Sequence, residues 1–107
     1  MEINPQYHPD DETWKDQVIP GCYVLCFLPA TLGTVYGAVK PTSPNDRSRG
    51  FIILDAYCKR VRTRETVLMP AQHVEMPLSK EQFDLAMSLG WPDDEMGLMR
   101  IFAVRPN

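Results

Sequence analysis

Residues 50–77, GFIILDAYCKRVRTRETVLMPAQHVEMP, decide the expected fold. The segment begins with an apolar run over 50–58 that is rich in β-branched and aromatic residues, as is typical of a strand. A basic stretch follows, and "ETVLM" at 65–69 predicts a second strand. "PAQH" at 70–73 predicts a single helical turn, and "VEM" at 74–76 a short strand ended by proline. The segment therefore predicts a hairpin, a one-turn helix and a closing strand.

Two further strands are expected before this segment. "GCYVLCFL" at 21–28 and "GTVYGAVK" at 33–40 combine β-branched and aromatic residues and are separated by a short turn. The intervening "PTSPNDRSRG" at 41–50 contains two prolines, an asparagine and a closing glycine, which predict a loop. Five strands in this order resemble the layout of a small SH3-like barrel over about 19–77. Closing a sheet into a barrel removes its exposed edges.

The resemblance is one of architecture, and it implies no particular activity. SH3-like barrels bind peptides, methylated tails, nucleic acids or copies of themselves. The fold class expected from the sequence is mainly β (α+β): a small SH3-like five-stranded barrel with one C-terminal helix and an added last strand.

The C-terminal helix has signals at both ends. Ser79 is a good N-cap, and Gln82 three residues later completes a capping box. Gly90 predicts the stop, so the helix is expected over about 80–89. "PDDEMG" at 92–97 is expected to be an acidic loop. "LMRIFAVRP" follows, and it predicts a last strand over about 98–104 that pairs with a free barrel edge or with another chain.

The chain of 107 residues fits one domain. Residues 1–16 carry five acids against one base and are expected to form a polar acidic N-terminal arm. Residues 17–107 are expected to form the single domain. The first residues lack an apolar leader, and the uncharged segment 17–39 is interrupted by prolines and glycines. We therefore expect a soluble, cytoplasmic protein without membrane contact.

Cysteine and histidine placement argues against a metal or a cofactor. Three cysteines are an odd count, which favours free thiols. Cys22 and Cys26 share a strand face but lie about 13 Å apart at the usual rise per residue, too far to share an ion. His8 stands in the arm, and His73 follows "MPAQ" without a nucleophile in view. No catalytic motif appears, so we expect a non-catalytic protein that needs no cofactor or metal.

Six of the eleven basic residues fall in the window 47–64 of a chain whose net charge is −3. If the strand over 51–58 ran on, three arginines would share one face. If the hairpin turned near 62–65, they would splay around its tip. Three interpretations stay open: a solvated hairpin tip, a nucleic-acid site, or a docking site for an acidic surface. The candidate polar contacts are Arg47, Arg49, Arg60, Arg62 and Arg64.

The strands over 21–28 and 51–58 are apolar on both faces. A barrel needs one apolar face per strand, so the second must be covered by the C-terminal helix, the last strand or another molecule. This pattern favours a protein–protein interface, including a homodimer, with Tyr36, Tyr57, Trp91 and Met99 as apolar anchors.

The expected function is a non-catalytic protein-binding module, self-association included, that acts as an accessory or inhibitor protein. One alternative is a nucleic-acid-binding small barrel that uses the basic 47–64 region. The other is a small-ligand-binding protein or enzyme with a pocket between helix and barrel.

Overall fold

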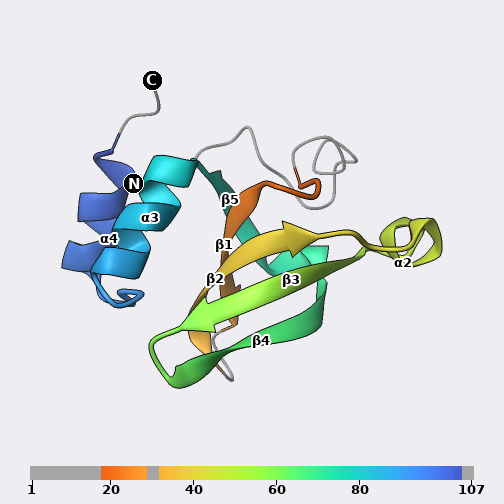
Figure 1. Ribbon diagram of the computed structural model, residues 1–107, viewed down its shortest axis with the longest axis horizontal. Coiled ribbons are helices and arrows are strands. Elements are labelled where there is room, and N and C mark those ends of the chain that lie inside the picture. Colours follow the sequence, from red (N-terminus) through yellow and green to blue (C-terminus); the bar gives the residue numbers. More distant parts are fainter. Residues whose placement is uncertain (1–17, 29–31, 105–107) are drawn as a thin grey trace.

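The computed structural model describes residues 18–28 and 32–104, except for the side chains of residues 61–64. Within these residues, five antiparallel strands form one sheet, and three α-helices and one 3₁₀ turn accompany it (Figure 1). The strands are β1 (Tyr23–Leu28), β2 (Gly33–Lys40), β3 (Phe51–Cys58), β4 (Val61–Pro70) and β5 (Val74–Leu78). The mainly β class is confirmed.

The strand order across the sheet is β4-β3-β2-β1-β5. Among the described residues, β4 and β5 pair with no strand on their outer sides, so the sheet is open. The closure of the barrel is therefore not confirmed. The 3₁₀ turn η1 (Ala71–His73) connects these two edge strands, where a one-turn helix was expected.

The β3–β4 hairpin turns at Lys59 and Arg60, with Cys58 paired to Val61. The turn lies earlier than the alternative near residues 62–65, and β3 does not run on through the arginines. The register shifts between Ala56 and Cys58.

Helix α3 (Lys80–Ser88) forms where the capping signals predict it. The Ser79 hydroxyl accepts from the Gln82 main-chain N–H, and the Gln82 side chain accepts from the Ser79 N–H at 2.8 Å. The helix ends in a Schellman motif: the N–H groups of Gly90 and Trp91 donate to the carbonyls of Met87 and Ala86. Both Gly90 and Trp91 have left-handed φ angles, of 78° and 59°.

The predicted last strand is wrong, because the segment is helical: α4 spans Glu95–Phe102. The Asp94 carboxylate caps it by accepting from the Gly97 main-chain N–H at 3.2 Å. A short apolar run such as LMRIF does not distinguish strand from helix by its periodicity. Part of the predicted loop 41–50 is also helical, as α2 (Pro44–Ser48), which Ser43 caps. None of the helices in the described part of the chain has the length and apolar character needed to cross a bilayer.

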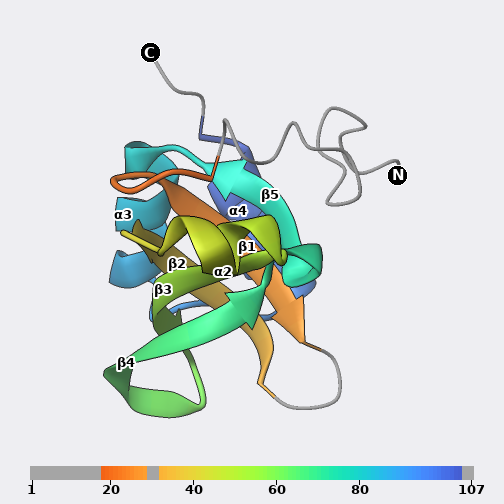
Figure 2. The same ribbon diagram turned by 90° about the vertical axis from the view of Figure 1, so that its right-hand side faces the viewer.

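The sheet separates two hydrophobic clusters. The inner cluster lies on the face of the sheet opposite the helices and includes Val24, Cys26, Val35, Ile52, Leu54 and Met69. The helix-side cluster lies between the sheet and helices α3 and α4, and includes Leu25, Tyr36, Leu78, Phe83, Ala86 and Ile101. Figures 1 and 2 show both helices packed on one side of the sheet. Alternate residues of β1 thus enter opposite clusters.

Candidate binding surfaces

An aromatic group fills the contact between the helices and the sheet. Trp91 packs on the neighbouring rings of Tyr36 and Tyr57, whose centroids lie 5.3 and 4.7 Å from its own. Phe83 of α3 stacks on Tyr23 at 4.3 Å. Such pairs stabilise beyond the area they bury, by about 0.5–1.5 kcal/mol each. They hold Trp91 in its left-handed conformation, which is unfavourable for a bulky residue.

The three aromatic residues expected as partner anchors therefore serve within the chain. Tyr36 is fully buried, and Tyr57 and Trp91 are half-buried. On the second apolar face of these strands, Tyr23 and Leu25 of β1 and Tyr57 of β3 pack against α3 and α4, so these three residues do not require another molecule. The position expected for a ligand pocket, between helix and sheet, is occupied by these rings. Phe27 at the end of β1 stays 46% exposed on that face.

The hydroxyl of Tyr36 donates a hydrogen bond to the main-chain carbonyl of Pro92. Burial raises the pKa of Tyr36 above its ordinary range, and the negative charges of Asp93 and Asp94 raise it further. The hydroxyl therefore stays protonated and remains a donor.

The basic residues do not form one patch in the described part of the chain. Arg47 donates from its guanidinium to the carbonyl of Val18 at 2.8 Å, and Arg49 is exposed at the end of α2. Arg60 is exposed in the hairpin turn, beside Lys59. Figure 1 shows α2 and this turn at opposite ends of the sheet.

Lys59 forms an ion pair with Asp93 across 3.6 Å, which joins the hairpin turn to the segment before α4. The residues Arg62 and Arg64 lie in β4, and their side chains are outside the described part of the structure.

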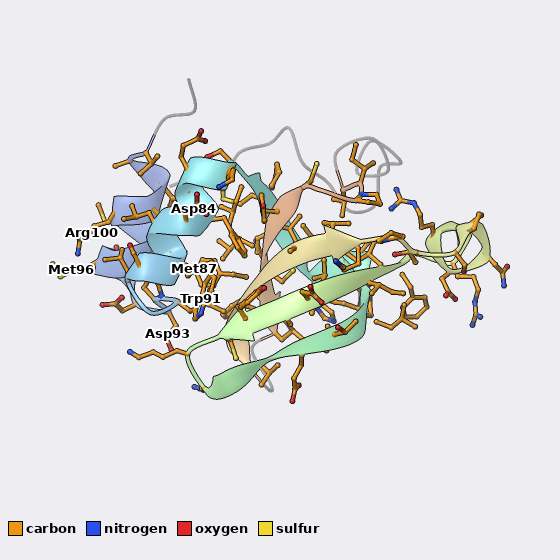
Figure 3. The ribbon with its side chains drawn as sticks, in the orientation of Figure 1. Asp84, Met87, Trp91, Asp93, Met96 and Arg100 are labelled. Carbon is orange, nitrogen blue, oxygen red and sulfur yellow. The ribbon has the colours of Figure 1, made fainter. Side chains whose placement is uncertain are left out.

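The outer side of α4 is apolar and exposed. Met96 and Met99 are 76% and 61% exposed, and Glu95 and Arg100 flank them. Figure 3 shows Met96 and Arg100 on the side of α4 away from the sheet. We call these four residues the α4 face. Leu98, Ile101 and Phe102 pack inward, so α4 has an apolar inner side and, on its outer side, two exposed methionines beside Glu95 and Arg100.

Met99 was expected as an anchor, and it is the one member of that set that is strongly exposed. The placement of Glu95 and Arg100 beside the methionines was not recognised in the sequence, because residues 92–97 were expected to form a loop and 98–104 a strand. The signal that was available is Asp94 followed by Glu95, an N-cap and a first-turn acid.

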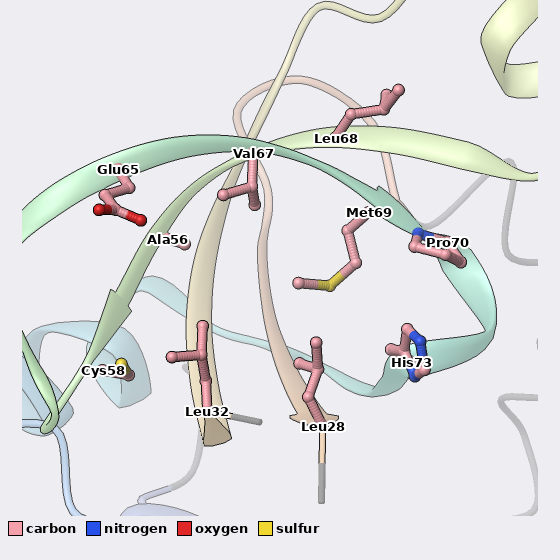
Figure 4. A pocket seen from close by; sticks show the side chains of 10 residues that line it. All are labelled: Leu28, Leu32, Ala56, Cys58, Glu65, Val67, Leu68, Met69, Pro70 and His73. Atoms are coloured by element: carbon pink, nitrogen blue, oxygen red, sulfur yellow. The ribbon is translucent and has the colours of Figure 1, made fainter. Parts of the chain in front are cut away.

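An apolar cavity of about 170 Å³ lies under β4. Val67 and Met69 of β4, Ala56 of β3, and Leu28 and Leu32 at the ends of β1 and β2 line it. Figure 4 shows Glu65 and His73 at opposite ends, and Leu68 directed away from it. Nothing in the sequence predicts this cavity, because its walls come from four separate segments.

The described cysteines are free thiols. Burial strongly raises the pKa of Cys26, and the charge of Glu75 adds to this effect, so the thiol stays protonated. In the residues that the structure describes, no three His, Cys, Asp or Glu side chains are grouped to hold a metal ion.

Comparisons with models of protein families, with curated proteins and with solved structures find no match to this chain.

Proposed function

We propose that this chain is a non-catalytic protein-binding module that self-associates through the α4 face. The scaffold is an SH3-like small barrel left open between β4 and β5. The strand order 4-3-2-1-5 and the 3₁₀ turn between the edge strands support this assignment. The observation that carries the proposal is the exposure of Met96 and Met99 between two opposite charges.

The spacing of the α4 face matches one heptad of a parallel helix pair. Met96 and Met99 occupy the two apolar seam positions, three residues apart. Glu95 and Arg100 then occupy the two flanking positions. In a parallel pair, the residue that flanks the seam on one side of a helix contacts a residue of the partner helix. That partner residue flanks the seam on the other side and lies five positions further along the sequence. Glu95 of one copy therefore faces Arg100 of the other, twice by symmetry.

Methionine suits such a seam because its unbranched thioether adapts to an imperfect fit. The contact is nevertheless small. An eight-residue helix is about 12 Å long, and its outer side alone offers less than the ~800 Å² per partner of a standard interface. We therefore expect weak, concentration-dependent association, with a dissociation constant above about 10 μM.

Sedimentation equilibrium over a wide concentration range tests the proposal. The wild type is expected to dimerise at high concentration, and Met99→Glu to remain monomeric. Met87→Glu is the matched control, because Met87 is half exposed on α3 and not on the α4 face. A wild type that stays monomeric at millimolar concentration would overturn the proposal, as would equal effects of the two variants.

Charge exchange tests the orientation. Glu95→Arg and Arg100→Glu are each expected to abolish self-association, because each places like charges across the seam. An equimolar mixture of the two variants is expected to form a heterodimer, since both cross-seam pairs become opposite again. The double variant E95R/R100E is expected to regain self-association. Single variants that dimerise like the wild type would rule out the parallel pairing.

A further inference from the structure

We infer that the edge of β4 and the cavity beneath it form a second binding site, which takes an extended peptide segment carrying one large apolar side chain. This site is separate from the α4 face and does not depend on self-association. It is built from the strand on which the sheet ends and from the interior that the open sheet leaves accessible.

The size of the cavity decides the kind of group that it accepts. Its volume of about 170 Å³ is close to that of an engineered apolar cavity of ~150 Å³ that binds benzene. Pockets for drug-sized ligands are larger, roughly 300–1,000 Å³. The cavity therefore fits one side chain of the size of leucine or phenylalanine, and its lining of Leu28, Leu32, Val67 and Met69 favours an apolar one.

The position of the cavity indicates how that side chain arrives. β4 is ten residues long and, among the described residues, hydrogen-bonds only to β3. An unpaired edge of this length is a template for an added strand. Figure 4 shows the cavity between β4 and the ends of β1 and β2. A strand added to β4 passes along this gap, and its alternate side chains point toward the cavity.

The rim of the site adds a charge preference. Among the described residues that line the cavity, Glu65 is the one that carries a charge, and it is exposed at one end. A basic residue two positions from the apolar one lies on the same face of an extended segment and approaches this carboxylate. The expected ligand is thus an extended segment with a central Leu or Phe and flanking Lys or Arg.

The experiment uses the blocked heptapeptide acetyl-TKVLVKT-amide and its alanine-centred counterpart. Titration into the ¹⁵N-labelled protein is expected to shift the amide signals of residues 65–69, 28 and 32. The leucine peptide is expected to bind about 10- to 100-fold more tightly than the alanine peptide, because it buries the larger side chain. Equal affinities, or shifts elsewhere only, would overturn the inference.

Protein variants locate the site. Ala56→Leu and Val67→Phe fill the cavity, and each is expected to abolish the preference for leucine while circular dichroism shows a folded sheet. Two variants are used because either one could fail to fold, and the test then rests on the other. Met87→Ala is the control, since Met87 lies on α3 and does not line the cavity, and it is expected to retain the preference. If a variant with a filled cavity folds and still prefers the leucine peptide, the proposed site is wrong.

Two further ligands distinguish the addition of a strand to β4 from simple filling of the cavity. A leucine peptide with N-methyl groups on alternate residues cannot form the ladder, and its binding is expected to be lost. Toluene tests the cavity alone. If toluene shifts the signals of 28, 32 and 67 while both unmethylated peptides leave β4 unchanged, the cavity binds small molecules and the strand-addition inference is wrong.

Discussion

Tyr36 and Pro92 lie 56 residues apart in the sequence and meet in one buried hydrogen bond, from the phenol to the main-chain carbonyl. The bond joins the central strand β2 to the short segment that connects α3 with α4. Because Trp91 precedes Pro92 and packs on Tyr36, the ring contact and the hydrogen bond fix the same turn. The position of α4 on the sheet thus depends on a strand residue far away in the chain.

Removal of the Tyr36 hydroxyl tests this link. Tyr36→Phe retains the ring but leaves the Pro92 carbonyl buried without its donor, so the free energy of unfolding is expected to fall by about 1–3 kcal/mol. Urea denaturation measures the change. Tyr57→Phe, in the same aromatic group, is the control and is expected to cost less than about 0.5 kcal/mol. Equal losses in the two variants would show that the Pro92 bond contributes nothing specific.

Alkaline pH is expected to destabilise the fold through Cys26 and Tyr36. Both groups have raised pKa values in the folded chain, above the ordinary 9.0 and 10.0 of the unfolded chain. The unfolded chain therefore releases these protons first, and stability that is complete below pH 9 falls as pH rises. The slope is at most about 1.4 kcal/mol per pH unit for each group.

Denaturant titrations at pH 8 to 11 measure this dependence. Cys26→Ala is expected to lower stability at neutral pH but to flatten the fall between pH 9 and 10. Tyr36→Phe is expected to flatten the fall above pH 10. A wild type whose free energy of unfolding is constant from pH 8 to 11 would contradict the assignment.

Gly97 allows α4 to begin close to the turn that precedes it. A Cβ at this position would lie 2.7 Å from the Asp94 carboxylate and still closer to the ring of Pro92, so both would have to move. Gly97→Ala is therefore expected to destabilise by about 1–3 kcal/mol, although alanine is the better helix former. Thermal unfolding measures the effect. Met99→Ala on the exposed side of the same helix is expected to be nearly neutral, and a neutral Gly97→Ala would refute the packing argument.

Nucleic-acid binding by the 47–64 region can be examined with random 20-nucleotide DNA and RNA over a salt series. We expect no binding at low salt, because Arg47 contacts the Val18 carbonyl, Lys59 contacts Asp93, and the net charge is negative. Binding with a steep salt dependence that Arg62→Ala and Arg64→Ala flatten would instead support that alternative.

The elements with local signals could be predicted from the sequence. The β2 boundaries 33–40 agree with the structure, and α3 ends one residue before the predicted limit. The capping residues Ser79 and Gln82 form the predicted contacts. The helical α4 could not be separated from a strand, because a short apolar run fits both periods. A glycine within a helix is unusual, and here it is explained by the close approach of Pro92, a residue outside the helix.

The binding surfaces were harder to predict than the elements. An aromatic residue on a strand can face a partner or the chain's own helix, and the sequence does not state which. Tyr36 and Trp91 are held by α3 and the turn after it, a relationship that requires the docking geometry. Met99 was expected at an interface because it lies near a predicted loop, and the structure shows that it is exposed. The cavity could not be expected, because it depends on how β4 passes over β1 and β2.

The two clusters on opposite sides of one sheet bear on how the chain tolerates mutation. Most strands of small domains have a solvent-facing side on which substitutions are nearly neutral. In β1, Val24 and Cys26 enter one cluster while Tyr23 and Leu25 enter the other. In a saturation mutagenesis library, this strand would accept few replacements on either of its two faces, except at Phe27. Permissive positions would concentrate in α2 and on the exposed sides of the two C-terminal helices.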